Sequence, residues 1–151
     1  MSQSLTQIYL HTIFSTKDRH PFLSDKTIRG KMHAYLVGVC GNLDCSSIIV
    51  GGVEDHVHLL SRHSKNISVA EFVQELKRES SKWVKTLDPG LKKFYWQKGY
   101  GAFSLSPSHV EAVKKYIEGQ EEHHRRETFQ DEFRAFLTKY GIEFDERYVW
   151  D

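Results

Sequence analysis

The order of apolar patterns along the chain is the feature that most restricts its fold. Short runs rich in β-branched and aromatic residues, typical of buried strands, alternate with segments whose apolar residues recur every three or four positions, typical of amphipathic helices. We expect strands at 7–15, 46–50, 55–60 and 94–105, and helices at 26–41 and 68–87. This order predicts an α+β, ferredoxin-like (split βαβ) fold: a four-stranded antiparallel sheet with helices on one face.

Local signals mark the beginnings and ends of the two helices. Ser24 or Asp25 can cap the first helix. Ser68, with Glu71 three residues later, forms a capping box at the start of the second helix, which Asp88-Pro89-Gly90 ends.

Two further helices are expected after the last strand. Ser106-Pro107-Ser108 begins one that runs from about residue 108 to 126, and a shorter one covers residues 129–140. They are extra to the ferredoxin-like unit, so the predicted fold includes an added C-terminal helix that is available to carry catalytic residues.

Composition describes an ordinary globular chain of 151 residues with a formal charge of +1, so any nucleic-acid surface must be local. We find no repeat or linker, and expect one domain over residues 1–151. No apolar run reaches the roughly 20 residues of a membrane helix, and the N-terminus does not resemble a signal peptide, which predicts a cytoplasmic protein without a membrane partner. Cys40 and Cys45 are expected to be free thiols.

The first candidate site is the triplet His56-Val57-His58. Alternate residues of a strand point to the same face, so the two imidazoles project side by side and could hold a metal ion. A surface pair is the simpler explanation, but the strand otherwise reads as core, where two polar rings require a partner.

The second candidate lies on the expected 108–126 helix. Tyr116 and Gln120 are four residues apart and therefore share a face. A helical tyrosine is most often a packing residue, so this pair carries little weight alone.

Charge is unevenly distributed along the chain. Residues 62–98 hold nine Lys and Arg against four Asp and Glu, whereas residues 118–151 hold five against ten. The basic residues that fall off the apolar stripe of the second helix are candidates for nucleic-acid binding: Lys77, Arg78, Lys82 and Lys85.

Four segments together resemble the single-tyrosine HUH transposases of small bacterial insertion sequences, including the REP-associated tyrosine transposases. They are His11–Lys17 with Arg19-His20-Pro21 after it, Asp55–Leu60, Trp96–Ser104 and Val113–His124. The resemblance covers about residues 5–126 and leaves a helical tail at 127–151. The combined motif is far more specific to this family than either of its parts. It consists of a histidine pair followed, at this separation, by a tyrosine with a glutamine four residues later.

The resemblance implies a metal-dependent enzyme that cuts and rejoins single-stranded DNA. Tyr116 would be the nucleophile that keeps the 5′ phosphate, and His56, His58 and Gln120 would bind a divalent ion. Imidazole and amide ligands suit Mg²⁺ or Mn²⁺. His124, four residues after Gln120, could ligate the metal in its place.

The resemblance also implies partners. Family members recognise hairpins at the ends of the element, and they are typically homodimers in which the tyrosine helix of one subunit can complete the histidine site of the other. Two other functions remain open: a non-catalytic or domesticated single-stranded nucleic-acid-binding protein derived from such an enzyme, and a small metal hydrolase that uses a bound water. Only the transposase requires the hydroxyl of Tyr116.

Overall fold

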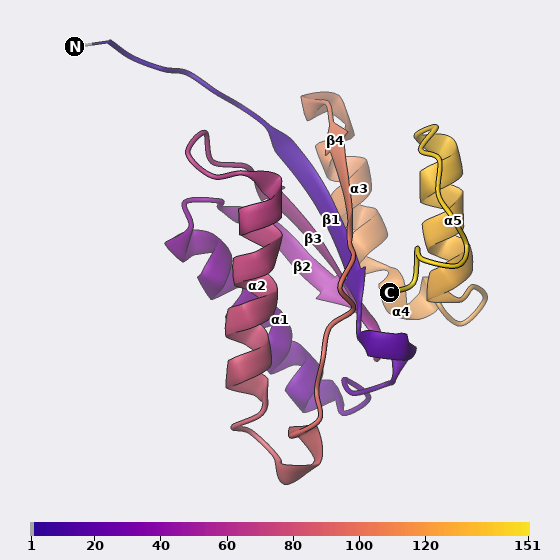
Figure 1. Cartoon of the computed structure of the whole chain (residues 1–151). Helices are drawn as coiled ribbons and strands as arrows, with labels where there is room; N and C mark the ends of the chain where they lie inside the picture. The colour runs from indigo at the N-terminus through magenta and orange to yellow at the C-terminus, as the bar shows by residue number, and fades with distance from the viewer. Residues whose placement is uncertain (1) are drawn as a thin grey trace.

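The computed structural model describes residues 2–151 and contains a four-stranded sheet in the order β2-β3-β1-β4, with every neighbouring pair antiparallel (Figure 1). The strands are β1 (Tyr9–Ser15), β2 (Ser47–Gly52), β3 (His56–Arg62) and β4 (Gly101–Leu105). The helices are α1 (Lys26–Asn42), α2 (Val69–Val84), α3 (Val110–Glu118), α4 (Gln120–His123) and α5 (Phe129–Lys139). The predicted α+β, ferredoxin-like class is confirmed, including the added C-terminal helix.

The two faces of the sheet pack against different helices and carry different residues, because successive strand residues point to opposite sides. Phe14, Val57 and Leu59 point toward α1 and α2 and form the main core with residues such as Leu36 and Phe72. Burial of this apolar surface is the main stabilising contribution to the domain.

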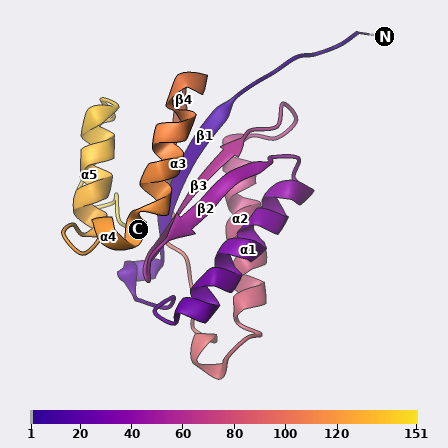
Figure 2. The ribbon, with the colours of Figure 1, turned by 180° about the vertical axis from the view of Figure 1, so that it is seen from behind.

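The opposite face of the sheet is covered by the C-terminal helices, as the view from behind shows (Figure 2). A second cluster joins Ile13 of β1 and Phe103 of β4 to Phe129, Phe133 and Leu137 of α5. The histidines of β3 lie on this face, so α3, α4 and α5 enclose the polar residues that the sheet presents there.

Both predicted N-terminal caps are present. Asp25, rather than Ser24, caps α1: its Oδ1 accepts hydrogen bonds from the backbone of Thr27 and Ile28. Ser68 Oγ accepts the backbone N–H of Glu71 at 3.0 Å. These bonds satisfy amides that the first turn of a helix leaves free.

The second helix ends earlier than predicted, at Val84 rather than Leu87. The hydroxyl and backbone N–H of Thr86 both bond to the carbonyl of Trp83, at 2.6 and 3.0 Å. These short-range bonds take the carbonyl that the next helical turn would use, so the chain leaves the helix before Asp88.

The prediction of one helix over residues 108–126 is wrong. A 3₁₀ turn (Pro107–His109) precedes α3, and Gly119, with φ −89° and ψ 14°, separates α3 from the single turn of α4. Gln120 is the first residue of α4; it is buried and contacts His56 of the sheet.

Only the end of the predicted strand 94–105 pairs as a regular strand. Trp96 makes an isolated bridge to Thr16, and the chain is irregular until Gly101. The amine of Lys77 stabilises this irregular segment, because it donates to the carbonyls of Gln97, Lys98 and Gly99 at 2.8, 3.1 and 2.6 Å.

Two further predictions concern membrane helices and the cysteines. Within residues 2–151, no helix is long and apolar enough to cross a membrane. Cys40 and Cys45 are buried free thiols, as predicted.

The helix that carries Tyr116 approaches the sheet closely at Gly51. A Cβ atom on Gly51 would lie 2.8 Å from Cγ2 of Ile117 and 3.0 Å from its carbonyl oxygen. We therefore expect Gly51→Ala to lower the free energy of unfolding by about 1–3 kcal/mol, because overpacking displaces α3. Urea denaturation measures the change.

The matched control is Gly38→Ala in α1, where an added Cβ would meet nothing within 4 Å. This control should leave stability unchanged or raise it by up to about 1 kcal/mol, since alanine favours a helix. Equal effects of the two substitutions would contradict the close approach of α3.

Candidate active site

The two histidines of β3 project from the sheet on the side of α3, α4 and α5. His56 and His58 are both fully buried, whereas Val57 between them packs in the main core on the other side. The strand pairing is regular here, with His58 opposite Ile13 and His56 opposite Ser15, so the backbone fixes the spacing of the rings. The pair therefore projects into a protected space, as the sequence predicts.

Each histidine has a partner on its outer nitrogen. His56 Nδ1 lies 2.7 Å from Oδ1 of Asp55, to which it donates. His58 Nδ1 lies 2.9 Å from Nε2 of His11 on the neighbouring strand. These contacts turn the Nε2 atoms of His56 and His58 toward the same interior space, which is the arrangement that orients imidazole ligands in metal sites.

The predicted tyrosine and glutamine both reach this space within one chain. Gln120 is buried, and its Oε1 lies 3.2 Å from His56 Nε2. The ring of Tyr116 is half-buried and lies 5.8 Å from that of His58, centroid to centroid. A cavity of about 330 Å³ opens beside Tyr116 and is also lined by His11, His109 and Tyr140.

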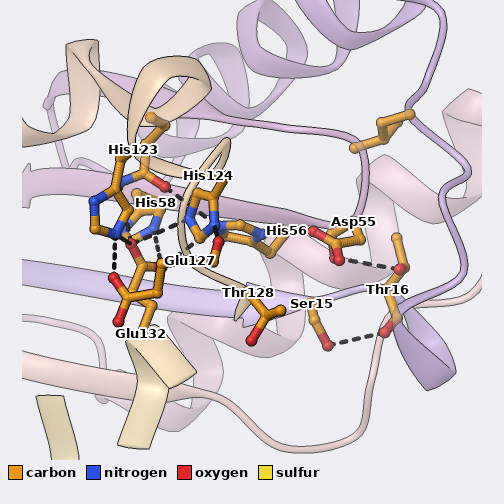
Figure 3. A network of polar contacts seen from close by, with 12 residues as sticks. Ser15, Thr16, Asp55, His56, His58, His123, His124, Glu127, Thr128 and Glu132 are labelled. Carbon is orange, nitrogen blue, oxygen red and sulfur yellow. Dashed lines mark hydrogen bonds and ion pairs between the residues drawn. The ribbon is translucent and has the colours of Figure 1, made fainter. Parts of the chain in front are cut away.

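The neighbouring histidines His123 and His124 also lie at the site (Figure 3). His124 donates from Nδ1 to the carbonyl of Glu127 at 2.6 Å, and its ring lies 4.4 Å from that of His56. His123 Nε2 lies 3.2 Å from the hydroxyl of Tyr116. His124 and Gln120 therefore both reach the strand histidines, and each has a donor atom that a metal ion could use.

Glu132, the central acidic residue of the site, was not among the site residues predicted from the sequence. Glu132 of α5 is only 2% exposed, and its carboxylate lies 2.9 Å from His58 Nε2 and 3.2 Å from His124 Nε2 (Figure 3). It also accepts a hydrogen bond from the hydroxyl of Tyr116. A signal was present: Glu132 shares the helix face of the buried residues Phe129 and Phe133, where a carboxylate needs a partner.

The buried charges alter the protonation of these groups. Burial alone would raise the pKa of Glu132, but hydrogen bonds from His124, His56 and His58 lower it well below its usual range. Burial opposes the charged form of His56, but its contacts with Asp55 and Glu132 raise its pKa to about 9. Without a bound ion, the site thus holds an anionic carboxylate beside a cationic imidazole.

Three groups next to this pair are held neutral: His58, His11 and Tyr116. Burial lowers the pKa of His58 to about 4, and burial together with His58 lowers that of His11 to about 3. Burial and the Glu132 carboxylate raise the pKa of Tyr116 above its usual range. An unaided phenolate is therefore disfavoured in this arrangement.

Donor atoms suited to a metal ion meet at one point. His56, His58, His124 and Glu132 each offer one ligand atom, and these atoms all lie within 4.8 Å of one another. Nitrogen and carboxylate donors of this kind fit a divalent ion such as Mn²⁺ or Zn²⁺, and the carboxylate also suits Mg²⁺. The residues present thus fit a metal, although the donor set does not fix which one.

The four predicted DNA-binding residues have different surroundings. Lys77 binds three backbone carbonyls, and burial lowers its pKa to about 8. Arg78 pairs with Glu75 at 2.6 Å. Lys85 lies 4.5 Å from the ring centre of the exposed Tyr95. Lys82 and Lys85 thus remain the better candidates for contacts with phosphates.

Comparison with known proteins identifies the family. The family model described as "Transposase IS200 like" matches residues 4–120, more than three quarters of the chain, and this segment contains the histidine pair, Tyr116 and Gln120. The chain belongs to the IS200-like transposase family, which confirms the resemblance to the single-tyrosine enzymes of insertion sequences.

Particular relatives agree with this assignment. The chain is 27% identical over 119 residues to the ISDra2 transposase TnpA of Deinococcus radiodurans, which covers 76% of this chain and 84% of the relative. A crystal structure described as a transposase from the same organism has a TM-score of 0.63 and 24% identity, and covers 80% of this chain and 98% of the other. A REP-associated tyrosine transposase bound to a REP hairpin has a TM-score of 0.58 at 14% identity, over 82% and 74% of the two chains.

The contacts of Lys77 predict a structural role that can be separated from DNA binding. We expect Lys77→Ala to lower the free energy of unfolding by about 1–3 kcal/mol, because three carbonyls of the loop at 97–99 lose their donor. Urea denaturation measures this change, and the matched control Lys82→Ala should alter stability by less than about 0.5 kcal/mol.

The affinity of the same two variants for single-stranded DNA is the second measurement. If Lys82 contacts a phosphate, Lys82→Ala should weaken binding and reduce the salt dependence of the affinity by roughly one phosphate contact. A Lys77→Ala variant of unchanged stability that loses DNA affinity like Lys82→Ala would show that Lys77 acts on DNA directly.

Proposed function

We propose that this protein is a metal-dependent DNA transposase that cleaves and rejoins single-stranded DNA through a covalent 5′-phosphotyrosine intermediate. The observation that carries the proposal is the position of Tyr116, whose hydroxyl contacts His123 and Glu132 and whose ring lies beside that of the buried His58. The whole chain, residues 1–151, would act as one transposase domain in the cytoplasm.

His56, His58 and Gln120 would hold Mg²⁺ or Mn²⁺, with Asp55 and His11 orienting the two imidazoles from behind. When bound, such an ion polarises the scissile phosphate and offsets negative charge that develops on its oxygens. Metal binding would also require His56 to give up its proton, since only the neutral ring is a ligand.

The covalent chemistry belongs to Tyr116. Its hydroxyl oxygen forms a bond to phosphorus, the bond from phosphorus to the 3′ oxygen breaks, and the tyrosine proton ends on the departing 3′ hydroxyl. The phosphotyrosine keeps the energy of the broken diester, so a second 3′ hydroxyl can attack it and rejoin strands without ATP. Retention of the 5′ phosphate is a property that the family resemblance implies.

The nucleic-acid partner would be single-stranded DNA that carries a hairpin at the end of the element. The structural relative bound to a REP hairpin supports this partner. Lys82 and Lys85 on α2 would contact phosphates, and the exposed ring of Tyr95 is available for stacking on a base.

A homodimer is also part of the proposal. Tyr116 and Gln120 already reach the histidines of their own chain. Light scattering after size exclusion would measure the oligomeric state, and cleavage by mixed inactive variants would show whether two subunits share a site.

The covalent mechanism predicts a result that neither alternative function shares. Labelled single-stranded DNA with the hairpin of the element's end, incubated with Mn²⁺ or Mg²⁺, should yield an adduct of protein and DNA on a denaturing gel. We expect Tyr116→Phe or a chelator to abolish the adduct, because the first removes the nucleophile and the second the Lewis acid.

Tyr148→Phe provides the matched control, because Tyr148 is a 64% exposed residue of the tail. The control should form the adduct at a rate within about twofold of the unaltered protein. Cleavage that survives Tyr116→Phe would instead support the metal hydrolase, and hairpin binding without an adduct under either metal would support the non-catalytic binding protein.

A further inference from the structure

The acidic C-terminal tail has no role in the proposed chemistry so far, although its helix α5 lies against the site. The family match ends at residue 120, and the Deinococcus structure covers 98% of its own chain but only 80% of this one. Glu132 therefore lies outside the segment that defines the family, yet it is the buried residue with the most polar contacts at the site.

We propose that Glu132 is a metal ligand supplied by the C-terminal helix, and that the same carboxylate positions Tyr116 at the metal. The inference rests on the proposed metal-dependent function. It adds to the His56, His58 and Gln120 set a fourth ligand that belongs to this chain's own tail.

The two oxygens of Glu132 face different groups. Oε1 lies 2.9 Å from His58 Nε2 and 3.4 Å from His56 Nε2, the two atoms that would bind the ion. Oε2 lies 3.2 Å from Gln120 Nε2 and accepts the hydrogen bond of the Tyr116 hydroxyl. One oxygen is therefore directed to the metal-binding nitrogens and the other to the nucleophile.

The spacing of the donor atoms fits ligands on one small cation. Ligands about 2.1 Å from an ion and at right angles to each other are about 3.0 Å apart. The relevant pairs are 2.9 Å for Glu132 with His58, 3.4 Å for Glu132 with His56, and 3.2 Å for His56 with the amide oxygen of Gln120. Little movement is therefore needed to direct these atoms at a common centre.

The chemistry of the donors also favours a carboxylate. Mg²⁺ and Mn²⁺ are hard ions that prefer oxygen ligands, and protein sites for Mg²⁺ usually include one or two carboxylates. Two imidazoles and an amide carry no negative charge. Asp55 cannot supply it, since its Oδ1 accepts the hydrogen bond from His56 Nδ1 on the far side of that ring.

The packing of the tail holds this carboxylate in place. Phe129 and Phe133 of α5 lie against Ile13 and Phe103, on either side of Glu132 in sequence. A Cβ atom at Gly101 would overlap the Phe133 ring, so α5 sits directly on β4. At the far end of the tail, the backbone carbonyl of Asp151 accepts the N–H of Gly99 at 2.8 Å.

The binding of Mn²⁺ to the full-length protein tests the proposal. Electron paramagnetic resonance of free Mn²⁺ during titration gives the affinity without DNA or catalysis. We expect Glu132→Gln to weaken binding at least about tenfold, since even residues behind the ligands change affinity by 10–100-fold. Glu132→Asp, which keeps the charge but shortens the side chain, should bind with intermediate affinity.

The matched control is Glu127→Gln. Glu127 is an acidic residue of the same tail whose carboxylate contacts His123 at 2.7 Å. The Glu127→Gln variant should bind Mn²⁺ with an affinity within about twofold of that of the unaltered protein, as expected for a substitution outside the metal site. Circular dichroism and the melting temperature of each variant without metal establish that it is folded.

The outcomes separate this inference from the proposed function. No Mn²⁺ binding by the unaltered protein, or binding unaffected by His58→Ala, would overturn the metal site itself. Binding that requires His58 but is as tight or tighter in Glu132→Gln would overturn only the role of Glu132. Tighter binding accompanied by faster adduct formation would identify Glu132 as a carboxylate that occupies the place of the scissile phosphate.

Discussion

A buried carboxylate surrounded by imidazoles is the interaction on which the rest of the catalytic face depends. An ionised group inside a protein must be paired, because the loss of hydration costs several kcal/mol. Glu132 finds its partners on three separate elements: His58 on β3, Gln120 on α4 and Tyr116 on α3. The arrangement joins the sheet to the C-terminal helices through charge and hydrogen bonds, whereas apolar packing dominates the other face of the sheet.

The division of the sheet into two faces follows from the period of a strand. Val57 packs in the main core because it lies between His56 and His58, and the same alternation places both rings on the opposite side. A shift of one residue in the pairing of β3 with β1 would bury the histidines under α1 and α2. The register that builds the core therefore also builds the site.

Much of this structure could be predicted from local patterns. The order of strands and helices gave the fold class, and the alternation of His56-Val57-His58 gave the shared direction of the rings. The separation of α3 from α4 could not be predicted, because Gly119 is tolerated in many helices and only the docking of α3 against Gly51 and of Gln120 against His56 determines its conformation.

Lys77 and Glu132 show why the remaining site residues were harder to assign. Sequence places Lys77 on a polar helix face, but three backbone carbonyls from a loop 20 residues away surround its amine. Glu132 appears as one acid among ten in residues 118–151, although its place on the apolar face of α5 distinguishes it. Long-range contacts decide both roles, and local spacing indicates only that Glu132 is buried.

The same contacts explain how a tyrosine at this site can remain inert until it is needed. Burial and the negative charge of Glu132 both oppose ionisation of Tyr116, so its pKa lies above the usual range while no cation is present. Positive charge brought to the nitrogens of His56 and His58 would offset the charge of Glu132 and so lower one of the two barriers to the phenolate. Reactivity of the nucleophile is then tied to assembly of the site, because the carboxylate that restrains Tyr116 is also the group that faces the histidines.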